Sequence, residues 1–283
     1  MLSKDLAGLR YTKGHGTEND FVLYADPEGL RPLTAEIAAW LCDRRAGIGA
    51  DGVIRAVPAD AEAQARGASW FMDYRNADGS LAEMCGNGAR VFVEFLQAEG
   101  LVSCVEGQPL TIATRGGLRE VTPCPGRYSV DMGCAPESPG PPVWVGVPGI
   151  NGMTLGTTFR LPNPHVVVAV TEQELRRVDL TDPPELNPVL PEGTNVEFIA
   201  IRGVEDGVGH LAMRVYERGV GETRSCGTGA AAAALAARAI AGEGSPNHWL
   251  VDVPGGRLEV QITPTAQVLL AGPATLVAQG TIL

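Results

Sequence analysis

The spacing of apolar positions along the chain predicts short helices that alternate with short strands. Ile37, Trp40 and Leu41 recur at helical spacing after Thr34, and Gly47 follows the end of this segment. Three more helices are predicted: residues 89–99, which stop at Gly100, a short helix that begins at the capping box of Thr171 and Glu174, and residues 229–241, which stop at Gly242. The last is nearly all alanine, and because alanine permits close packing we expect it to be central.

Runs of β-branched and aromatic residues predict strands on both sides of these helices. The predicted strands are residues 20–24, 69–74 and 110–114 in the first half, and 165–170, 196–201, 211–216 and 257–262 in the second. The last two alternate apolar and polar side chains, a pattern that suits antiparallel strands with one solvated face. The proline-rich stretch at residues 135–148 lies between the two sets and is the best candidate for a domain boundary.

A short motif occurs twice in the chain. Residues 84–89 read Met-Cys-Gly-Asn-Gly-Ala, and residues 225–230, 141 positions later, read Ser-Cys-Gly-Thr-Gly-Ala. Each copy follows a polar loop and precedes a predicted helix, and each half has strands ahead of its motif. The repeat predicts an α+β fold of two similar halves, each with one cysteine, Cys85 or Cys226, at a helix N-terminus.

A cysteine at a helix N-terminus is in a chemically special position. The unpaired N–H groups of the first turn and the helix dipole favour negative charge there, and glycines let an anion approach the backbone. We expect a carboxylate to bind at such a turn. We also expect the same field to lower the pKa of the thiol from ~8.5 toward the ~3.5–7.5 of reactive cysteines.

Two such cysteines facing one cleft would suit a specific reaction, the inversion of a carbon centre by proton exchange. A base on one face removes the proton, an acid on the other face returns one, and a thiolate and a thiol exchange these roles when the reaction runs backward. Helix N-termini aimed at the substrate carboxylate would stabilise the carbanion. The residues alone therefore favour a cofactor-independent amino-acid racemase or epimerase that uses Cys85 and Cys226.

Composition narrows the chemistry further. Of the 22 basic residues only Lys4 and Lys13 are lysines, so the sequence argues against a Schiff base with pyridoxal phosphate. None of the six cysteines forms a C-x-x-C pair or stands with histidines at zinc-ligand spacing, and we therefore expect neither a cofactor nor a metal. The four cysteines outside the motifs are interpreted as ordinary thiols: Cys42, Cys104, Cys124 and Cys134.

Charge and length exclude other classes of protein. The 283 residues include 33 acidic and 22 basic side chains, a net charge of −11, and such a surface lacks the basic footprint that nucleic acid or an anionic membrane requires. The N-terminus has no signal-peptide h-region, and no run approaches the ~18 apolar residues of a membrane span. These features predict a cytoplasmic protein with reduced thiols and a small-molecule substrate.

Other interpretations of the motif fit less well. Cys85 with Arg90 gives C-x4-R, one residue short of the C-x5-R phosphate loop, and the second copy has no arginine there. A dinucleotide-binding fingerprint fails because the third glycine is missing after Gly86 and Gly88. A cysteine hydrolase would use one cysteine with a histidine and would leave the second motif unexplained.

The chain as a whole resembles the diaminopimelate epimerase family. The resemblance rests on segments in the family's order, at residues 16–21, 47–52, 76–80, 84–90, 163–165, 193–196 and 216–229. It implies interconversion of LL- and meso-2,6-diaminopimelate by two cysteines without cofactor or metal, a step in lysine and peptidoglycan precursor synthesis. It also implies a homodimer whose chains have two pseudo-symmetric α+β halves, each a mostly antiparallel sheet or barrel around a central helix. The predicted domains are residues 1–133 with 273–283, which carry Cys85, and residues 134–272, which carry Cys226.

Individual site residues follow from the same resemblance. Cys85 and Cys226 match the acid–base pair, and His165 and Glu217 match auxiliary positions. The residues that match substrate contacts are Asn19, Asn76, Gly86, Asn87, Asn163, Asn195, Glu217, Arg218, Gly227 and Thr228. Some relatives carry a substrate-contacting Gln where this chain has Gly52, so that contact is not carried over. The spacing around His15 also differs from the family's commonest form.

Two alternatives stay open at this level. A proline-type racemase uses a similar pair of cysteines but usually has His where this chain has Asn87, and it lacks the context of Glu217 and Arg218. A protein that binds an anion or an amino acid at the helix ends without catalysis would need neither thiol. Entry of solvent deuterium at the substrate α-carbon, and loss of turnover in Cys85→Ala and Cys226→Ala, separate catalysis from binding.

Overall fold

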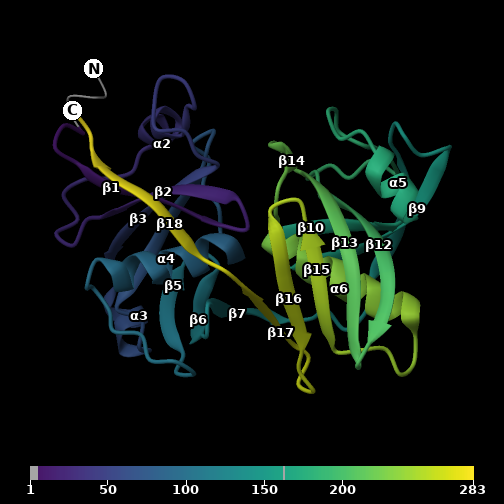
Figure 1. Ribbon diagram of the computed structural model, residues 1–283. Coiled ribbons are helices and arrows are strands. Elements are labelled where there is room, and N and C mark those ends of the chain that lie inside the picture. The colour runs from purple at the N-terminus through teal and green to yellow at the C-terminus, as the bar shows by residue number, and fades with distance from the viewer. Residues whose placement is uncertain (1–5, 162) are drawn as a thin grey trace. The chain divides into compact units, whose positions relative to one another are not determined.

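The computed structural model describes residues 6–161 and 163–283 and divides into two compact units. The first unit consists of Met1–Val130 with Gly272–Leu283, and the second consists of Asp131–Ala271. Each combines a sheet with one long helix: α4 (Gly86–Ala98) packs on strands of the first unit and α6 (Gly227–Ala241) on strands of the second (Figure 1). The C-terminal segment of the chain thus returns to the first unit.

The first unit is a sheet in which most neighbouring strands are antiparallel. Its strands are β1 (Arg10–Gly16), β2 (Asn19–Ala25), β3 (Gly52–Pro58), β4 (Trp70–Asn76), β5 (Leu110–Thr114), β6 (Gly117–Cys124), β7 (Arg127–Cys134) and β18 (Thr275–Thr281). The last residues of β7, from Asp131 onward, already belong to the second unit. They pair in the order β18–β1–β2–β3–β4–β5–β6–β7, in which β2–β3 and β4–β5 are parallel. Two shorter helices, α2 (Ala35–Cys42) and α3 (Ala61–Ala65), lie in the connections on either side of β3.

The second unit is built in the same way. Its strands are β8 (Gly140–Gly146), β9 (Met153–Leu161), β10 (Asn163–Ala169), β11 (Glu185–Asn187), β12 (Asn195–Glu205), β13 (Val208–Glu217), β14 (Gly221–Thr223), β15 (His248–Val253), β16 (Gly256–Ile262) and β17 (Gln267–Gly272). The main order is β8–β9–β10–β12–β13–β15–β16–β17, with β10–β12 and β13–β15 parallel. The helix α5 (Glu172–Arg177) follows β10 and carries the predicted capping box.

The two units repeat one topology. Along both orders the third and fifth pairings are parallel and the others are antiparallel. In each unit the long helix is the crossover of the second parallel pair, β4–α4–β5 or β13–α6–β15, because parallel strands need a long connection. This confirms the prediction of an α+β fold with two pseudo-symmetric halves.

Both long helices are buried. The apolar face of α4 consists of Val91, Phe92, Phe95 and Leu96, none more than 2% exposed. In α6 every residue from 230 to 237 is at most 7% exposed, and all but one of them is alanine. Strands β9, β10, β12, β13, β15 and β16 all pack on this helix, which small side chains permit. The prediction that the alanine helix is central is confirmed.

The helices begin earlier than apolar spacing predicts. α4 begins at Gly86 and α6 at Gly227, whereas the periodicity places their starts at residues 89 and 229. The first turn of each helix consists of small or polar residues that carry no apolar pattern, so periodicity misses it. The cysteine of each motif is therefore the N-cap itself and precedes the helix directly.

Several elements were missed by the periodicity: α3, β1, β3, β6, β7, β8, β9, β11, β14, β15, β17 and β18. The proline-rich stretch at residues 135–148 contains β8, and a register shift between Gly140 and Val143 accommodates its two prolines. Strand β13 is antiparallel to β12 but parallel to β15, so the antiparallel prediction for this strand is correct on one side only. The domain limits predicted from the sequence, residues 1–133 with 273–283 and residues 134–272, remain a prediction.

In the described part of the chain, the helices are too short or too polar to span a membrane.

Candidate functional site

Cys85 caps the N-terminus of α4 with its own side chain. Its backbone is extended, with φ −137° and ψ 116°, and its Sγ accepts a hydrogen bond from the Gly88 N–H at 3.3 Å. Ser, Thr, Asp or Asn usually makes this contact at an N-cap. The sulfur therefore lies at the positive end of the helix dipole, as the sequence predicts.

A buried arginine lies beside this turn. Arg90 is fully buried, and its guanidinium donates to the Gly86 carbonyl at 3.2 Å, to Asn87 Oδ1 at 2.8 Å and to the Pro273 carbonyl at 3.3 Å. Burial lowers the pKa of Arg90 to about 10, and the neighbouring Cys85 acts in the opposite direction. The first unit thus holds a cation near its cysteine, and a cation near a thiol favours the thiolate.

Amide side chains surround the same turn. Asn19, at the start of β2, has its Oδ1 3.8 Å from Cys85 Sγ and accepts a hydrogen bond from Asn87 Nδ2 at 3.3 Å. The Asn19 Nδ2 donates to Asp51 Oδ2 at 2.9 Å, which fixes the direction of this amide. The structure brings together three of the predicted site residues: Asn19, Cys85 and Asn87.

Cys226 caps α6 with the same geometry. Its backbone angles are φ −124° and ψ 117°, and its Sγ accepts a hydrogen bond from the Gly229 N–H at 3.3 Å. Thr228 Oγ1 lies 3.5 Å from this sulfur. The residue is 6% exposed. The repeat in the sequence is therefore a repeat in local structure, with one sulfur at each helix N-terminus.

A buried imidazole–carboxylate pair adjoins the first turn of α6. His165 Nδ1 and Glu197 Oε1 lie 2.7 Å apart, and both side chains are fully buried. Within residues 6–161 and 163–283, His165 Nε2 and Glu197 Oε2 have no hydrogen-bond partner. A Cβ built on Gly229 would lie 2.6 Å from Glu197 Oε1, so the carboxylate lies directly against the helix backbone.

The surroundings of Cys226 oppose its ionisation. Burial raises the pKa of Cys226 well above its usual value, and the carboxylates of Glu217 and Glu197 raise it further. Contacts with Thr228 and the Gly229 N–H lower the pKa by less. The sequence-based expectation of a lowered thiol pKa is therefore wrong for Cys226, because desolvation and two acids outweigh the helix terminus.

The other predicted residues of the second unit follow strand ends. Glu217 ends β13 and accepts a hydrogen bond from Thr223 Oγ1. Asn195, at the start of β12, accepts a hydrogen bond from the Arg218 backbone N–H through Oδ1 at 2.9 Å. The Arg218 guanidinium donates to the Glu192 carbonyl at 2.7 Å. The structure thus brings Asn195 and Arg218 together.

Strand register relates the site residues of the two units. Asn76 and Glu217 each precede their cysteine by nine residues, and each ends a strand. Asn76 lies opposite Gly52 in the β3–β4 pairing. In the β12–β13 pairing Val196 lies opposite Tyr216, so the next residues along the two strands, Asn195 and Glu217, also lie opposite each other. Asn76 therefore matches Glu217 in the repeat, and Gly52 matches Asn195.

Two buried polar positions of the second unit match apolar positions of the first. In the parallel pairing β2–β3, Phe21 lies opposite Gly52, and in β10–β12, His165 lies opposite Asn195, so Phe21 matches His165. Ile54 and Glu197 lie two residues after Gly52 and Asn195, so these two residues also match. Phe21 and Ile54 are fully buried. A Cβ built on Gly88 would meet Ile54 Cδ1 at 3.3 Å, whereas a Cβ built on the equivalent Gly229 would meet the Glu197 carboxylate.

Two predicted substrate contacts make few bonds to the rest of the site. The Asn76 side chain donates to Ser80 Oγ at 3.0 Å. Asn163 begins β10, two residues before His165. Gly52 has no room for the Gln of some relatives, because a Cβ there would lie 2.5 Å from Tyr74 Cε2.

Sequence reasoning missed three charged residues near the cysteines. From the sequence Arg90 suggests only a phosphate loop, and neither Asp51 nor Glu197 has a predicted role. Glu197 interrupts the apolar run at residues 196–201, and an acid inside such a run is the signal that could have identified it. Asp51 has no comparable signal, since it lies in a loop between Gly49 and Gly52 rather than inside an apolar run.

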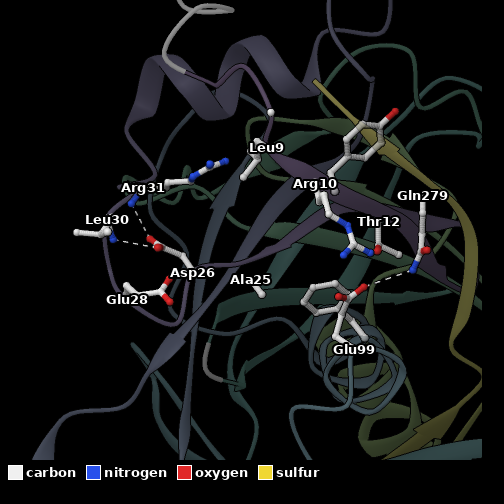
Figure 2. A pocket seen from close by; sticks show the side chains of 13 residues that line it. Leu9, Arg10, Thr12, Ala25, Asp26, Glu28, Leu30, Arg31, Glu99 and Gln279 are labelled. Atoms are coloured by element: carbon white, nitrogen blue, oxygen red, sulfur yellow. Dashed lines mark hydrogen bonds between the residues drawn. The ribbon is translucent and has the colours of Figure 1, made fainter. Parts of the chain in front are cut away.

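A separate cavity of about 410 Å³ lies in the first unit. Figure 2 shows that Asp26 accepts hydrogen bonds from the backbone N–H groups of Leu30 and Arg31, at 2.9 and 2.8 Å. On the other side Gln279 donates to Glu99 at 3.4 Å (Figure 2). Several polar groups of this cavity therefore bond to one another, and none of the predicted site residues lines it.

The sequence matches one family along most of its length. Residues 11–136 and 158–277 match the family model described as diaminopimelate epimerase. The diaminopimelate epimerase of Streptomyces coelicolor is 44% identical over 96% of this chain and 94% of its own length. That of Thermobifida fusca is 46% identical over 96% of this chain and 97% of its own length.

Solved structures of lower identity share the fold. A phenazine biosynthesis protein of the PhzF family from Bacillus anthracis aligns with a TM-score of 0.68 at 16% identity, over 97% of this chain and 99% of its own. A hydroxyproline epimerase from Agrobacterium vitis, solved with trans-4-hydroxy-L-proline, aligns with a TM-score of 0.61 at 15% identity, over 97% of this chain and 92% of its own. At such identities the likeness concerns the fold alone.

Proposed function

Because this chain belongs to the diaminopimelate epimerase family, we propose that it interconverts LL-2,6-diaminopimelate and meso-2,6-diaminopimelate by inverting one α-carbon. It is an epimerase that works without pyridoxal phosphate. Support comes from relatives of that name that align with nearly the whole chain. The observation that carries the proposal is the pair of cysteines, Cys85 and Cys226, each of which caps a long helix through its sulfur.

The proposed chemistry is a two-base proton exchange. One cysteine, as thiolate, uses a sulfur electron pair to take the α-proton, and the electrons of the broken C–H bond remain on carbon. The other cysteine, as thiol, delivers its proton to the opposite face, and its S–H electrons stay on sulfur. The two residues end with their roles exchanged, ready for the reverse reaction. Only protons move, so the step needs no oxidant, reductant or cofactor.

The difficult species in this reaction is the carbanion next to a carboxylate. The N–H groups in the first turns of α4 and α6, at Gly86, Asn87, Gly227 and Thr228, are the proposed donors to that carboxylate. There the positive end of the helix dipole offsets the developing charge, and fixed donors of this kind are usually the largest contribution to catalysis. Arg218 is the proposed partner of a substrate carboxylate, because a guanidinium can bind one through two parallel hydrogen bonds.

Amide and carboxylate side chains complete the proposed site. Diaminopimelate carries two ammonium and two carboxylate groups, so its recognition requires both acceptors and donors. The proposed contacts beyond those above are Asn19, Asn76, Asn163, Asn195 and Glu217, with His165 and Glu217 in auxiliary roles. Hydrogen bonds to Asp51 and to the Arg218 N–H hold Asn19 and Asn195 in fixed directions, which supports their assignment to recognition.

The wider setting of this activity is part of the same proposal. The product would supply lysine and peptidoglycan precursor synthesis, and the protein would work as a homodimer in the cytoplasm, where its thiols stay reduced. The domains would be residues 1–133 with 273–283 and residues 134–272.

An assay with two substrates tests the proposal. The purified protein is incubated in deuterium oxide with LL-diaminopimelate or with L-proline, and proton NMR follows the α-hydrogen. We expect loss of the α-proton signal and formation of meso-diaminopimelate, with L-proline unchanged. Exchange on L-proline alone would indicate a proline-type racemase. Saturable binding of diaminopimelate without exchange would indicate a binding protein.

A further inference from the structure

Glu197 has no place in the proposed proton exchange, yet it is buried beside one of the two cysteine turns. Its side chain is fully buried together with that of His165, at an Nδ1–Oε1 distance of 2.7 Å. The second polar atom of each side chain, His165 Nε2 and Glu197 Oε2, has no partner among the described residues. Each such atom costs about 1–3 kcal/mol of folding free energy, so stability alone does not explain the pair.

The carboxylate of Glu197 and the sulfur of Cys226 contact the same residue of α6. The Gly229 N–H donates to Cys226 Sγ at 3.3 Å, and a Cβ on the same residue would lie 2.6 Å from Glu197 Oε1. Gly229 therefore separates the acid from the thiol, and any larger residue would displace the carboxylate. Glycine at this position allows the acid to approach the turn.

The first unit lacks this pair at the matching positions. Phe21 and Ile54, both fully buried, correspond to His165 and Glu197. The same backbone therefore folds with an apolar pair, and the polar pair of the second unit is not a requirement of the topology. Its presence beside only one of the two matched cysteines points to a role in the reaction.

We propose that Glu197 is a positioning residue for Cys226: held by His165 against the first turn of α6, its carboxylate keeps the Cys226 sulfur protonated in the free protein. Cys226 is then the acid of the first half-reaction whenever Cys85 is the base. The inference rests on the proposed function for this catalytic consequence, whereas the effect of the carboxylate on the thiol concerns the protein without substrate.

Two acids act on the Cys226 thiol from the strands that pack on α6. They are Glu197 of β12 and Glu217 at the end of β13, and β10 contributes His165, which contacts Glu197. Most other charged side chains on the strands around α6 form ion pairs: Arg160–Glu192, Arg202–Glu172, Arg214–Glu222, Asp252–Arg257 and His248–Glu259. Glu205, at the exposed end of β12, and His210 of β13 are the remaining acidic or basic side chains on these strands. Removal of Glu197 would therefore leave one acid, Glu217, beside the thiol.

A titration of the thiol tests this proposal without substrate. The full chain is labelled with carbon-13 at the Cβ of cysteine, and the Cys226 resonance is assigned by its loss in Cys226→Ser. The chemical shift of this carbon is followed against pH in the native protein and in Glu197→Gln. We expect the midpoint to fall by about one pH unit in Glu197→Gln, which is about tenfold more thiolate at a given pH.

Two further variants make the result specific. Glu222→Gln removes a carboxylate of β14 whose partner is Arg214, and the Cys226 midpoint should not move. The double variant His165→Phe/Glu197→Ile copies the residues of the first unit and keeps the test available where Glu197→Gln does not fold. The double variant should lower the midpoint as Glu197→Gln does.

The outcomes separate this inference from the proposed function. A folded Glu197→Gln protein or a folded double variant that titrates at the native midpoint would overturn the role of Glu197, whatever the activity of the protein. A lowered midpoint in a protein that does not epimerise diaminopimelate would support the charge effect and contradict the proposed function.

Discussion

The turns that carry Cys85 and Cys226 share one backbone geometry and differ in the charges beside the sulfur. In both, the cysteine caps a long helix and accepts an N–H bond at 3.3 Å from a glycine three residues later. Beside Cys85 the structure buries a cation, Arg90, whereas beside Cys226 it buries Glu197 and has Glu217 close enough to raise the thiol pKa. A duplicated fold can therefore supply the same geometry twice while local substitutions set the charge of each copy.

This difference suits a reaction that needs one base and one acid at the start. A positive neighbour favours a thiolate, and negative neighbours with burial favour a thiol. Two turns with identical surroundings would give two thiolates or two thiols at once. The proposed exchange then has a defined starting state, with Cys85 as the base and Cys226 as the acid.

The largest expected effect is on turnover in the single cysteine variants. Cys85→Ala and Cys226→Ala should each lower kcat/KM for diaminopimelate by about 10³-fold or more, because each removes an acid–base group. Cys104→Ala, which removes a half-buried thiol outside both motifs, is the matched control and should keep native activity. Full activity in either motif variant, measured by formation of the meso isomer, would exclude a two-base mechanism.

A second effect concerns the stability of the buried pair in the second unit. His165→Ala should lower the free energy of unfolding by about 3 kcal/mol or more, because it leaves the Glu197 carboxylate buried without a partner. The double variant His165→Phe/Glu197→Ile should recover most of this loss, since the first unit folds with Phe21 and Ile54 at the matching positions. Urea unfolding of the three proteins measures both quantities. A loss below about 1 kcal/mol in His165→Ala would mean that the carboxylate is not buried as a charge.

A third effect is the order in which the two thiols react. Cys85 should be alkylated by iodoacetamide at neutral pH at least about tenfold faster than Cys226, because Cys226 is 6% exposed and its thiol pKa is raised. Arg90→Met should slow the labelling of Cys85 and leave that of Cys226 unchanged. Peptide mapping by mass spectrometry gives both rates. Faster labelling of Cys226 would contradict the difference in charge between the two turns.

The smallest effect concerns the stability of the protein at low pH, to which Asp20 at the start of β2 contributes. Burial opposes ionisation of Asp20, but hydrogen bonds from Arg44 and Lys13 outweigh it and lower the pKa of Asp20 to about 2. Because this pKa is below the unfolded value of ~3.9, the stabilisation is complete above ~3.9 and is lost as the pH falls toward 2. Asp20 is partly solvated and the pKa of its neighbour Asp51 is raised, so we expect Asp20 to contribute only about 1 kcal/mol to the free energy of unfolding.

The measurement is thermal or urea unfolding as a function of pH. Asp20→Asn should flatten the decline between about pH 4 and pH 2, and Asp60→Asn, at the N-cap of a short exposed helix, serves as a control. If stability falls with pH in Asp20→Asn as it does in the native protein, other carboxylates cause the loss of stability at low pH.

The repeat and the caps could be predicted from the sequence because they are local. The two cysteine motifs are visible as short strings, and the Thr171–Glu174 capping box lies within one turn. The alanine helix is visible from composition, and its burial follows from the absence of bulky side chains. What the sequence fails to indicate is the start of α4 and α6, where glycines carry no periodicity.

The charges beside the sulfurs could not be predicted because they depend on strand register. Glu197 adjoins Cys226 only because β12 packs on α6, and His165 meets Glu197 only through the parallel pairing of β10 with β12. These contacts join residues about thirty positions apart in the chain. The helix-terminus argument therefore placed both cysteines correctly at helix N-termini but gave the wrong direction for the thiol pKa of Cys226, since it omitted burial and the two acids.

The origin of the hydrogen in the product tests the two-base exchange most directly. LL-diaminopimelate is incubated with the protein in deuterium oxide, and the meso product and the remaining substrate are analysed by mass spectrometry early in the reaction. A two-base exchange predicts a deuterium at the inverted centre of nearly every product molecule and little deuterium in the remaining substrate, because the returning proton comes from a second thiol equilibrated with solvent. Retention of the original hydrogen in the product, or equal deuterium in product and substrate, would contradict it.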